Sequence, residues 1–140
     1  MKLLLALSML TFTTISFACT DFSGNYIDDD SNPYSIIQTG CESLKLGDVT
    51  LVTDGYFRLK EETTVIKILS ASNHIDDYLQ VEVLLDYKIA FPAEMPIELI
   101  PFKYVVIYTI GWKDNLAIDT TVYNKSGDVI SSDNTIHQKL

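Results

Sequence analysis

The chain has two cysteines, Cys19 and Cys41, and their chemistry depends on how close folding brings them. Turn-forming residues divide the segment 23–39 into two short runs of strand character. A hairpin in which Tyr26 lies opposite Tyr34 also places Cys19 opposite Cys41, within bridging range. The sequence therefore predicts a Cys19–Cys41 disulfide, which the chain-entropy model values at about 3 kcal/mol.

Residues 1–18 have the layout of a secretory signal peptide. One lysine precedes the apolar run 3–10, and the small residues Ser16 and Ala18 occupy positions −3 and −1 of a cleavage site. We therefore expect a mature chain of residues 19–140 in a secreted or periplasmic location, where disulfides persist.

The alternative role for Cys19 is that of a lipidated first residue, which would tether the protein to a membrane. Bacterial lipoproteins carry leucine at −3 and a small residue at −2, where this chain has Ser16 and Phe17. A lipid would also leave Cys41 unpaired in an oxidising space. The sequence thus favours the disulfide over the lipid anchor.

Metal-binding patterns are incomplete. Asp28, Asp30 and Asn32 have the spacing of a calcium loop, but its sixth position is Pro33 instead of glycine and its twelfth is Thr39 instead of glutamate. The residues are also common turn formers. We therefore expect a solvated hairpin turn and no metal site.

Patterns of enzyme chemistry are equally sparse. His74 and His137 are far apart in sequence and belong to no zinc-binding spacing. The chain contains no G-x-S-x-G elbow, and a disulfide would remove both thiols as nucleophiles. These patterns predict a protein that is not an enzyme and has no cofactor.

The charge argues against two classes of partner. The formal net charge is −9, and Arg58 is the only arginine. Nucleic acids and anionic membrane surfaces are bound through lysine and arginine, so we expect neither as a partner. The longest apolar run after the leader, residues 104–108, is far too short for a membrane span.

The candidate ligand-binding residues are Phe91, Met95, Ile97 and Trp112. Three prolines exclude residues 90–101 from a central strand, yet the segment is too apolar for a solvated loop. It either fills the mouth of a barrel as core or covers a cavity. Trp112 lies between two predicted strands and either caps the end of the barrel or anchors a ligand or partner.

Short strands separated by turns make up the rest of the mature chain, with no sustained helical periodicity. A two-residue turn at Asp54-Gly55 is expected to join its flanking strands into a hairpin, and residues 73–77 to form a loop. The sequence predicts an all-β single domain, an antiparallel up-and-down barrel of about 8–10 strands. The expected strands are 23–27, 34–39, 42–46, 49–53, 56–60, 63–70, 79–86, 102–110, 116–123, and 129–131 with 135–139.

The segment Phe22-Ser23-Gly24-Asn25-Tyr26 resembles the opening of the first strand in lipocalins and related calycin barrels. Gly24 matches the glycine of their G-x-W segment, and Tyr26 matches the tryptophan. Lipocalins also have an arginine near the C-terminus that packs over that tryptophan, where this chain has His137 or Lys139. The resemblance implies a barrel that holds a small apolar molecule.

We therefore predict an exported, non-enzymatic binding protein for a small apolar ligand, which requires a cavity beneath residues 91–100. The alternative is a cell-envelope or secreted protein-interaction module, including an inhibitor of a secreted enzyme, which predicts an exposed apolar patch. An enzyme would instead require titratable groups that converge in a cleft.

Overall fold

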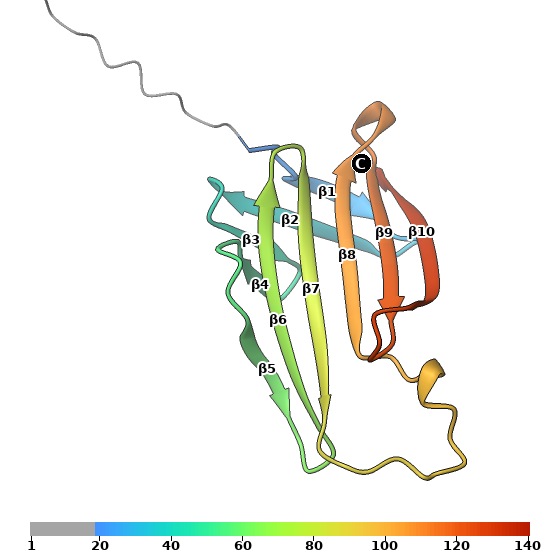
Figure 1. The fold of residues 1–140 in the computed structure, drawn as a ribbon. Coiled ribbons are helices and arrows are strands. Elements are labelled where there is room, and N and C mark those ends of the chain that lie inside the picture. The colour runs from blue at the N-terminus through green and yellow to red at the C-terminus, as the bar shows by residue number, and fades with distance from the viewer. Residues whose placement is uncertain (1–18) are drawn as a thin grey trace, which may run out of the picture.

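A computed structural model describes residues 19–140, so the predicted signal peptide lies outside the described residues. This part of the chain forms ten strands in one antiparallel sheet and two short 3-10 helices (Figure 1). The strands are β1 (Gly24–Ile27), β2 (Pro33–Thr39), β3 (Ser43–Leu46), β4 (Val49–Val52), β5 (Arg58–Glu62), β6 (Ile66–Ile75), β7 (Tyr78–Tyr87), β8 (Lys103–Ile110), β9 (Leu116–Tyr123) and β10 (Val129–Lys139). The 3-10 helices are η1 (Ile97–Leu99) and η2 (Trp112–Asp114).

The sheet order is β4-β3-β2-β1-β10-β9-β8-β7-β6-β5, so the prediction of an all-β antiparallel fold is confirmed. Consecutive strands pair with one exception, because β4 and β5 lie at the two opposite edges. The predicted closure into a barrel is not seen, since no ladder joins these edges. After β4, the chain contacts β6 through an isolated bridge between Asp54 and Asn73. The Gly55 amide also donates a 2.8 Å hydrogen bond to the Ser72 carbonyl.

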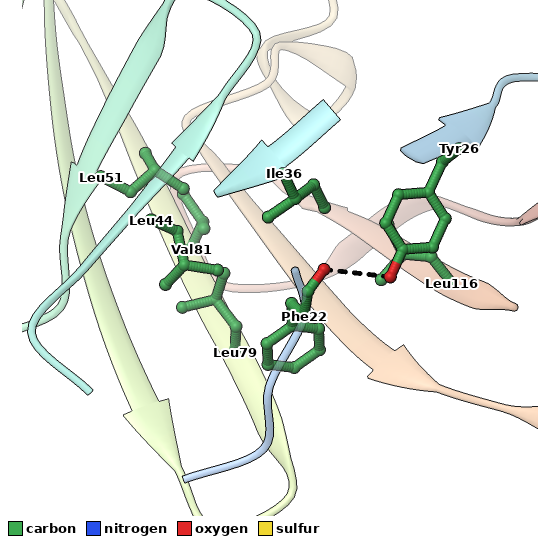
Figure 2. Close-up of a cluster of buried hydrophobic side chains, with 8 residues drawn as sticks. All are labelled: Phe22, Tyr26, Ile36, Leu44, Leu51, Leu79, Val81 and Leu116. Carbon is green, nitrogen blue, oxygen red and sulfur yellow. Dashed lines mark hydrogen bonds between the residues drawn. The ribbon is translucent and has the colours of Figure 1, made fainter. Parts of the chain in front are cut away.

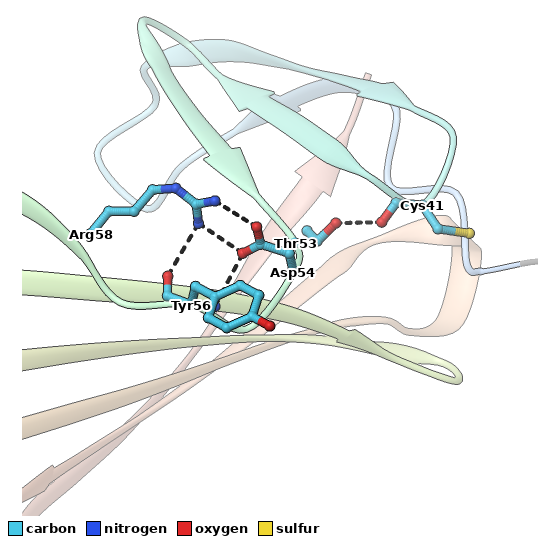
Figure 3. Close-up of polar contacts among 5 residues, drawn as sticks. All are labelled: Cys41, Thr53, Asp54, Tyr56 and Arg58. Atoms are coloured by element: carbon cyan, nitrogen blue, oxygen red, sulfur yellow. Dashed lines mark hydrogen bonds and ion pairs between the residues drawn. The ribbon is translucent and has the colours of Figure 1, made fainter.

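The predicted hairpin at Asp54-Gly55 is wrong, because the polar contacts of this segment turn the chain elsewhere (Figure 3). The Arg58 guanidinium donates to both Asp54 carboxylate oxygens, at 2.8 and 2.5 Å, and holds the pKa of that carboxyl at about 2. The Tyr56 amide donates to the same carboxylate at 3.1 Å. Asp54 thus organises the loop before β5, and β5 pairs with the edge of β6 that faces away from β7.

Three other strands differ from the prediction: β5 and β6 begin two and three residues later than expected, β6 also ends later, and β10 is continuous. β6 continues to Ile75, so residues 73–77 are mostly strand, and only Asp76 and Asp77 turn the chain into β7. Asn73 and His74 are paired with Gln80 and Leu79 in the β6–β7 ladder and point to opposite faces of the sheet, which a turn-based interpretation misses. β10 is one strand of 11 residues with an irregularity between Val129 and Ser131, not two short pieces.

The first hairpin has the predicted register. Tyr26 pairs with Tyr34, and the disulfide joins Cys19 to Cys41 with a Cα–Cα distance of 5.7 Å. The predicted disulfide is confirmed. It occupies the Cys19 Sγ atom that a lipid would require, so the lipid-anchor alternative does not fit this structure.

The core lies where β1 to β4 pack across one end of the long strands (Figures 1 and 2). Tyr26 is fully buried, and its hydroxyl donates to the Phe22 carbonyl at 3.0 Å. On β7, Leu79 and Val81 belong to this core, whereas the other end of the strand lies beyond it. The buried cluster comprises Phe22, Tyr26, Ile36, Leu44, Leu51, Leu79, Val81 and Leu116.

His74 borders this core in an unusual state. Its ring lies 5.4 Å from the Phe22 ring, and within residues 19–140 neither of its buried nitrogens has a hydrogen-bond partner. Burial disfavours the imidazolium and lowers the pKa of His74. The folded state therefore binds this proton less readily than the unfolded chain does.

We expect the free energy of unfolding to fall as the pH drops below about 6.5, the ordinary histidine value. The contribution of His74 is fully present above that value and is lost on the way to its lower folded-state pKa. Urea titrations between pH 7.5 and 5.5 measure the slope, and His74→Phe should flatten it. An equal slope in both proteins would contradict this role of His74.

Candidate functional site

An open cavity of about 960 Å³ lies at the end of β7 that the core does not occupy. β6, β7, the β7–β8 connection, β8, and the end of β9 with the turn after it all contribute to its lining. Most of the wall is apolar. Its aliphatic part consists of Leu69, Leu84, Leu85, Ile89, Ala90 and Ile97.

Tyr87, the last residue of β7, organises the aromatic part of the wall. Its ring meets the Phe91 ring edge to face at 5.0 Å and the Phe102 ring at 5.3 Å. Its hydroxyl donates to the Pro101 carbonyl at 3.0 Å, and burial raises the pKa of Tyr87. One side chain therefore fixes both ends of the β7–β8 connection.

Asn124, in the turn after β9, holds the middle of that connection. Its buried side-chain amide donates to the Glu98 carbonyl at 3.1 Å and to an Asp128 carboxylate oxygen at 3.2 Å. The Lys88 amide adds a 2.9 Å hydrogen bond to the Val65 carbonyl at the start of the connection. The connection therefore has a defined course around the cavity although it is mostly irregular.

Three charged side chains line the cavity: Asp86, Lys103 and Lys125. The Lys103 ammonium lies 3.3 Å from a Glu82 carboxylate oxygen and 5.5 Å from the centre of the Tyr123 ring. The Lys125 ammonium lies 5.7 Å from the centre of the Phe102 ring. The site therefore combines apolar walls with cations at its border.

The structure brings together two of the four residues predicted to bind ligand. Phe91 and Ile97 line the cavity, whereas Met95 lies on the same connection, 45% exposed, and does not line it. Trp112 follows the opposite end of β8 and is not near this cavity.

Several lining residues were missed. Leu85 and Tyr87 continue the alternation of β7, and Phe102 immediately precedes β8 in the alternating pattern of that segment, so the pattern could have indicated them. No signal in the sequence points to Lys125, which reaches the cavity from a turn.

Trp112 does not cap the sheet end, because its side chain is 81% exposed. Lys113 and Asp114 both have left-handed backbone conformations, with φ values of 59° and 60°. Non-glycine residues adopt this conformation at some energetic cost, and such strain is found preferentially at functional sites. The Lys113 ammonium lies 4.4 Å from the centre of the indole ring. The loop tip formed by η2 is therefore a second candidate site.

Residues 28–32, which have part of the spacing of a calcium loop, form the turn between β1 and β2. The Asp28 carboxylate accepts hydrogen bonds from the Asp30 and Asn32 amides at 3.0 and 2.7 Å, as expected for a turn. Residues 19–140 contain no cluster of three or more His, Cys, Asp or Glu side chains suited to a metal ion. Across the same residues, no helix has the length and apolar character needed to cross a membrane.

Comparisons of this chain with protein-family models, with curated proteins and with solved structures find no match.

Proposed function

We propose that this protein is an exported, non-enzymatic binding protein that holds a small apolar ligand in the cavity beneath the β7–β8 connection. The observation that carries the proposal is the cavity itself, about 960 Å³ with mainly apolar walls. Ligand pockets in proteins have volumes of about 300–1,000 Å³ and similar linings. A ligand there would bury aliphatic and aromatic surface that now faces an open space.

The position of the cavity also supports binding. The buried cluster that stabilises the fold lies at the other end of β7, so a ligand can enter without displacing core side chains. Tyr87 and Asn124 hold the connection in place before any ligand arrives. A wall that is already ordered loses little conformational entropy when a ligand binds.

Export and a lipocalin-like barrel are part of the proposal, and the first strand supports them. The Cys19–Cys41 disulfide is typical of oxidising compartments. A Cβ atom on Gly24 would lie 3.0 Å from the Lys139 Cε atom and 3.2 Å from the Tyr26 ring. Gly24 thus lies close to the Tyr26 ring and to the Lys139 side chain, two of the residues that the lipocalin resemblance concerns, and the Asp54–Asn73 bridge links the residue segment after β4 to β6.

Titration with the neutral fluorescent probe N-phenyl-1-naphthylamine tests ligand binding. We expect saturable binding to one site and at least tenfold weaker binding to Ile97→Asp, because a carboxylate in an apolar cavity opposes an apolar ligand. Leu99→Asp is the matched control, since Leu99 lies two residues away, is 66% exposed and does not line the cavity. Absence of saturable binding, or equal loss in both variants, would refute the proposal.

The second candidate function is a protein-interaction module of the cell envelope or secreted space, and exposed Trp112 favours it. Tryptophan is enriched among the residues that dominate binding energy at protein interfaces. Because Trp112 is the only tryptophan, its fluorescence reports directly on the tip. A partner bound there should shift the emission to shorter wavelength, and Trp112→Ala should abolish the complex. A complex that survives Trp112→Ala unchanged would contradict this candidate.

A further inference from the structure

The charges around the cavity contain information about the ligand that its volume does not. Acidic residues outnumber lysines and arginine by 19 to 10 in this chain, yet two lysines and one aspartate line the cavity. The local sign is therefore opposite to that of the protein as a whole. The two lysines differ, however, in whether a carboxylate of the protein already pairs with the ammonium group.

Lys103 has a partner within the fold. Its ammonium pairs with the Glu82 carboxylate at 3.3 Å, and the Gln80 side-chain amide donates to the same carboxylate group at 2.7 Å. Asp86, the anionic lining residue, lies directly opposite Lys67 across the β6–β7 ladder. Lys103 therefore has an ion-pair partner within the fold, and Asp86 lies opposite a lysine on the neighbouring strand.

Lys125 is different. Among residues 19–140, no carboxylate forms an ion pair with the Lys125 ammonium. The ammonium instead lies over the face of the Phe102 ring. Two hydrogen bonds fix the backbone of the turn that contains Lys125. The Gly127 amide donates to the Asn124 carbonyl at 3.1 Å, and the Asp128 amide donates to the Asn124 side-chain oxygen at 2.9 Å. A cation is thus held over the aromatic wall of an apolar cavity without an anion.

We propose that the ligand is an anionic amphiphile, with one apolar chain against the walls and an acidic head group bound by the Lys125 ammonium. This inference rests on the proposed function, since it names the class of ligand for the same cavity. The apolar chain takes the space between Leu84, Ile97 and Phe102, and the head group stays at the border, where water completes its solvation. Carboxylate and phosphate head groups share this chemistry.

Displacement of N-phenyl-1-naphthylamine at pH 7.5 by twelve-carbon amphiphiles, below their micelle concentrations, tests the inference. We expect dodecanoate or dodecyl phosphate to bind about fivefold tighter than dodecyltrimethylammonium, because the Lys125 ammonium attracts an anionic head group and repels a cationic one. Whichever of the two anions binds more tightly identifies the head group as carboxylate or phosphate. Added salt should reduce the preference, since the pair lies at the surface.

Lys125→Met should lower the affinity for the anion about fivefold relative to the affinity for the neutral probe, whereas Lys125→Arg should retain the original ratio. Lys45→Met, at an exposed position of β3, removes one positive charge away from the cavity and is the matched control. If Lys125→Met binds the anion as the original protein does, the inference fails and the apolar binding function stands. If the original protein binds no neutral probe, both fail.

Discussion

Replacing Tyr26 with alanine is expected to lower the free energy of unfolding by about 3–5 kcal/mol, the range found for large aromatic residues in cores. The Tyr26 side chain is fully buried, and its ring stacks on the Tyr34 ring at 5.8 Å. Alanine removes the buried ring together with its contact to Tyr34, and it leaves a cavity between β1 and the strands that pack against it. Guanidinium titration followed by circular dichroism measures the loss.

Two control variants separate burial from hydrogen bonding. Tyr26→Phe keeps the ring and removes only the hydroxyl that donates to the Phe22 carbonyl, so we expect a loss of about 1 kcal/mol. Tyr56→Ala removes an aromatic residue that is 72% exposed and should change stability by less than about 0.5 kcal/mol. Similar losses for Tyr26→Ala and Tyr56→Ala would contradict the position of the core.

Removal of the disulfide should have the second large effect. Cys19 and Cys41 are 22 residues apart, and cross-linking a loop of this length reduces the entropy of the unfolded chain. The double variant Cys19→Ser with Cys41→Ser should therefore lose about 3 kcal/mol of unfolding free energy. Thermal or denaturant melts under oxidising conditions provide the comparison.

Reduction of the original protein is the matched control for that variant. Dithiothreitol should lower its unfolding midpoint to that of the double variant and leave the double variant unaffected. An unchanged midpoint after verified reduction would show that the bridge does not stabilise the fold. Cleavage after residue 18 together with the disulfide predicts an intact mass of residues 19–140 less two hydrogen atoms, which mass spectrometry measures.

Local patterns account for the parts of the fold that the sequence predicts well. The alternation in β7 and β9 and the turn after β1 are set by neighbours in sequence, so these strands and the register of the first hairpin are predicted correctly. The Asp54-Gly55 turn fails for the opposite reason. Arg58 and Ser72, residues outside the turn, compete for its carboxylate and amide and override the local preference.

Strand direction explains why the candidate site is only partly correct. Phe91 and Ile97 precede β8 and Trp112 follows it, and eight extended residues separate their ends by about 26 Å. Connections before and after one strand therefore belong to opposite ends of the sheet. Lys125 lies at the cavity end because β9 returns the chain there, which becomes evident only from the topology.

The pairing of β1 with β10 has a consequence for when this protein can fold. These strands lie together in the middle of the sheet, and the hydrogen bond between the Tyr34 hydroxyl and His137 Nδ1 joins residues 103 positions apart. During synthesis, β1 to β4 leave the ribosome long before β10 exists, and contacts so distant in sequence form slowly. The central ladder of the sheet, between β1 and β10, can therefore form only after the last strand has been made.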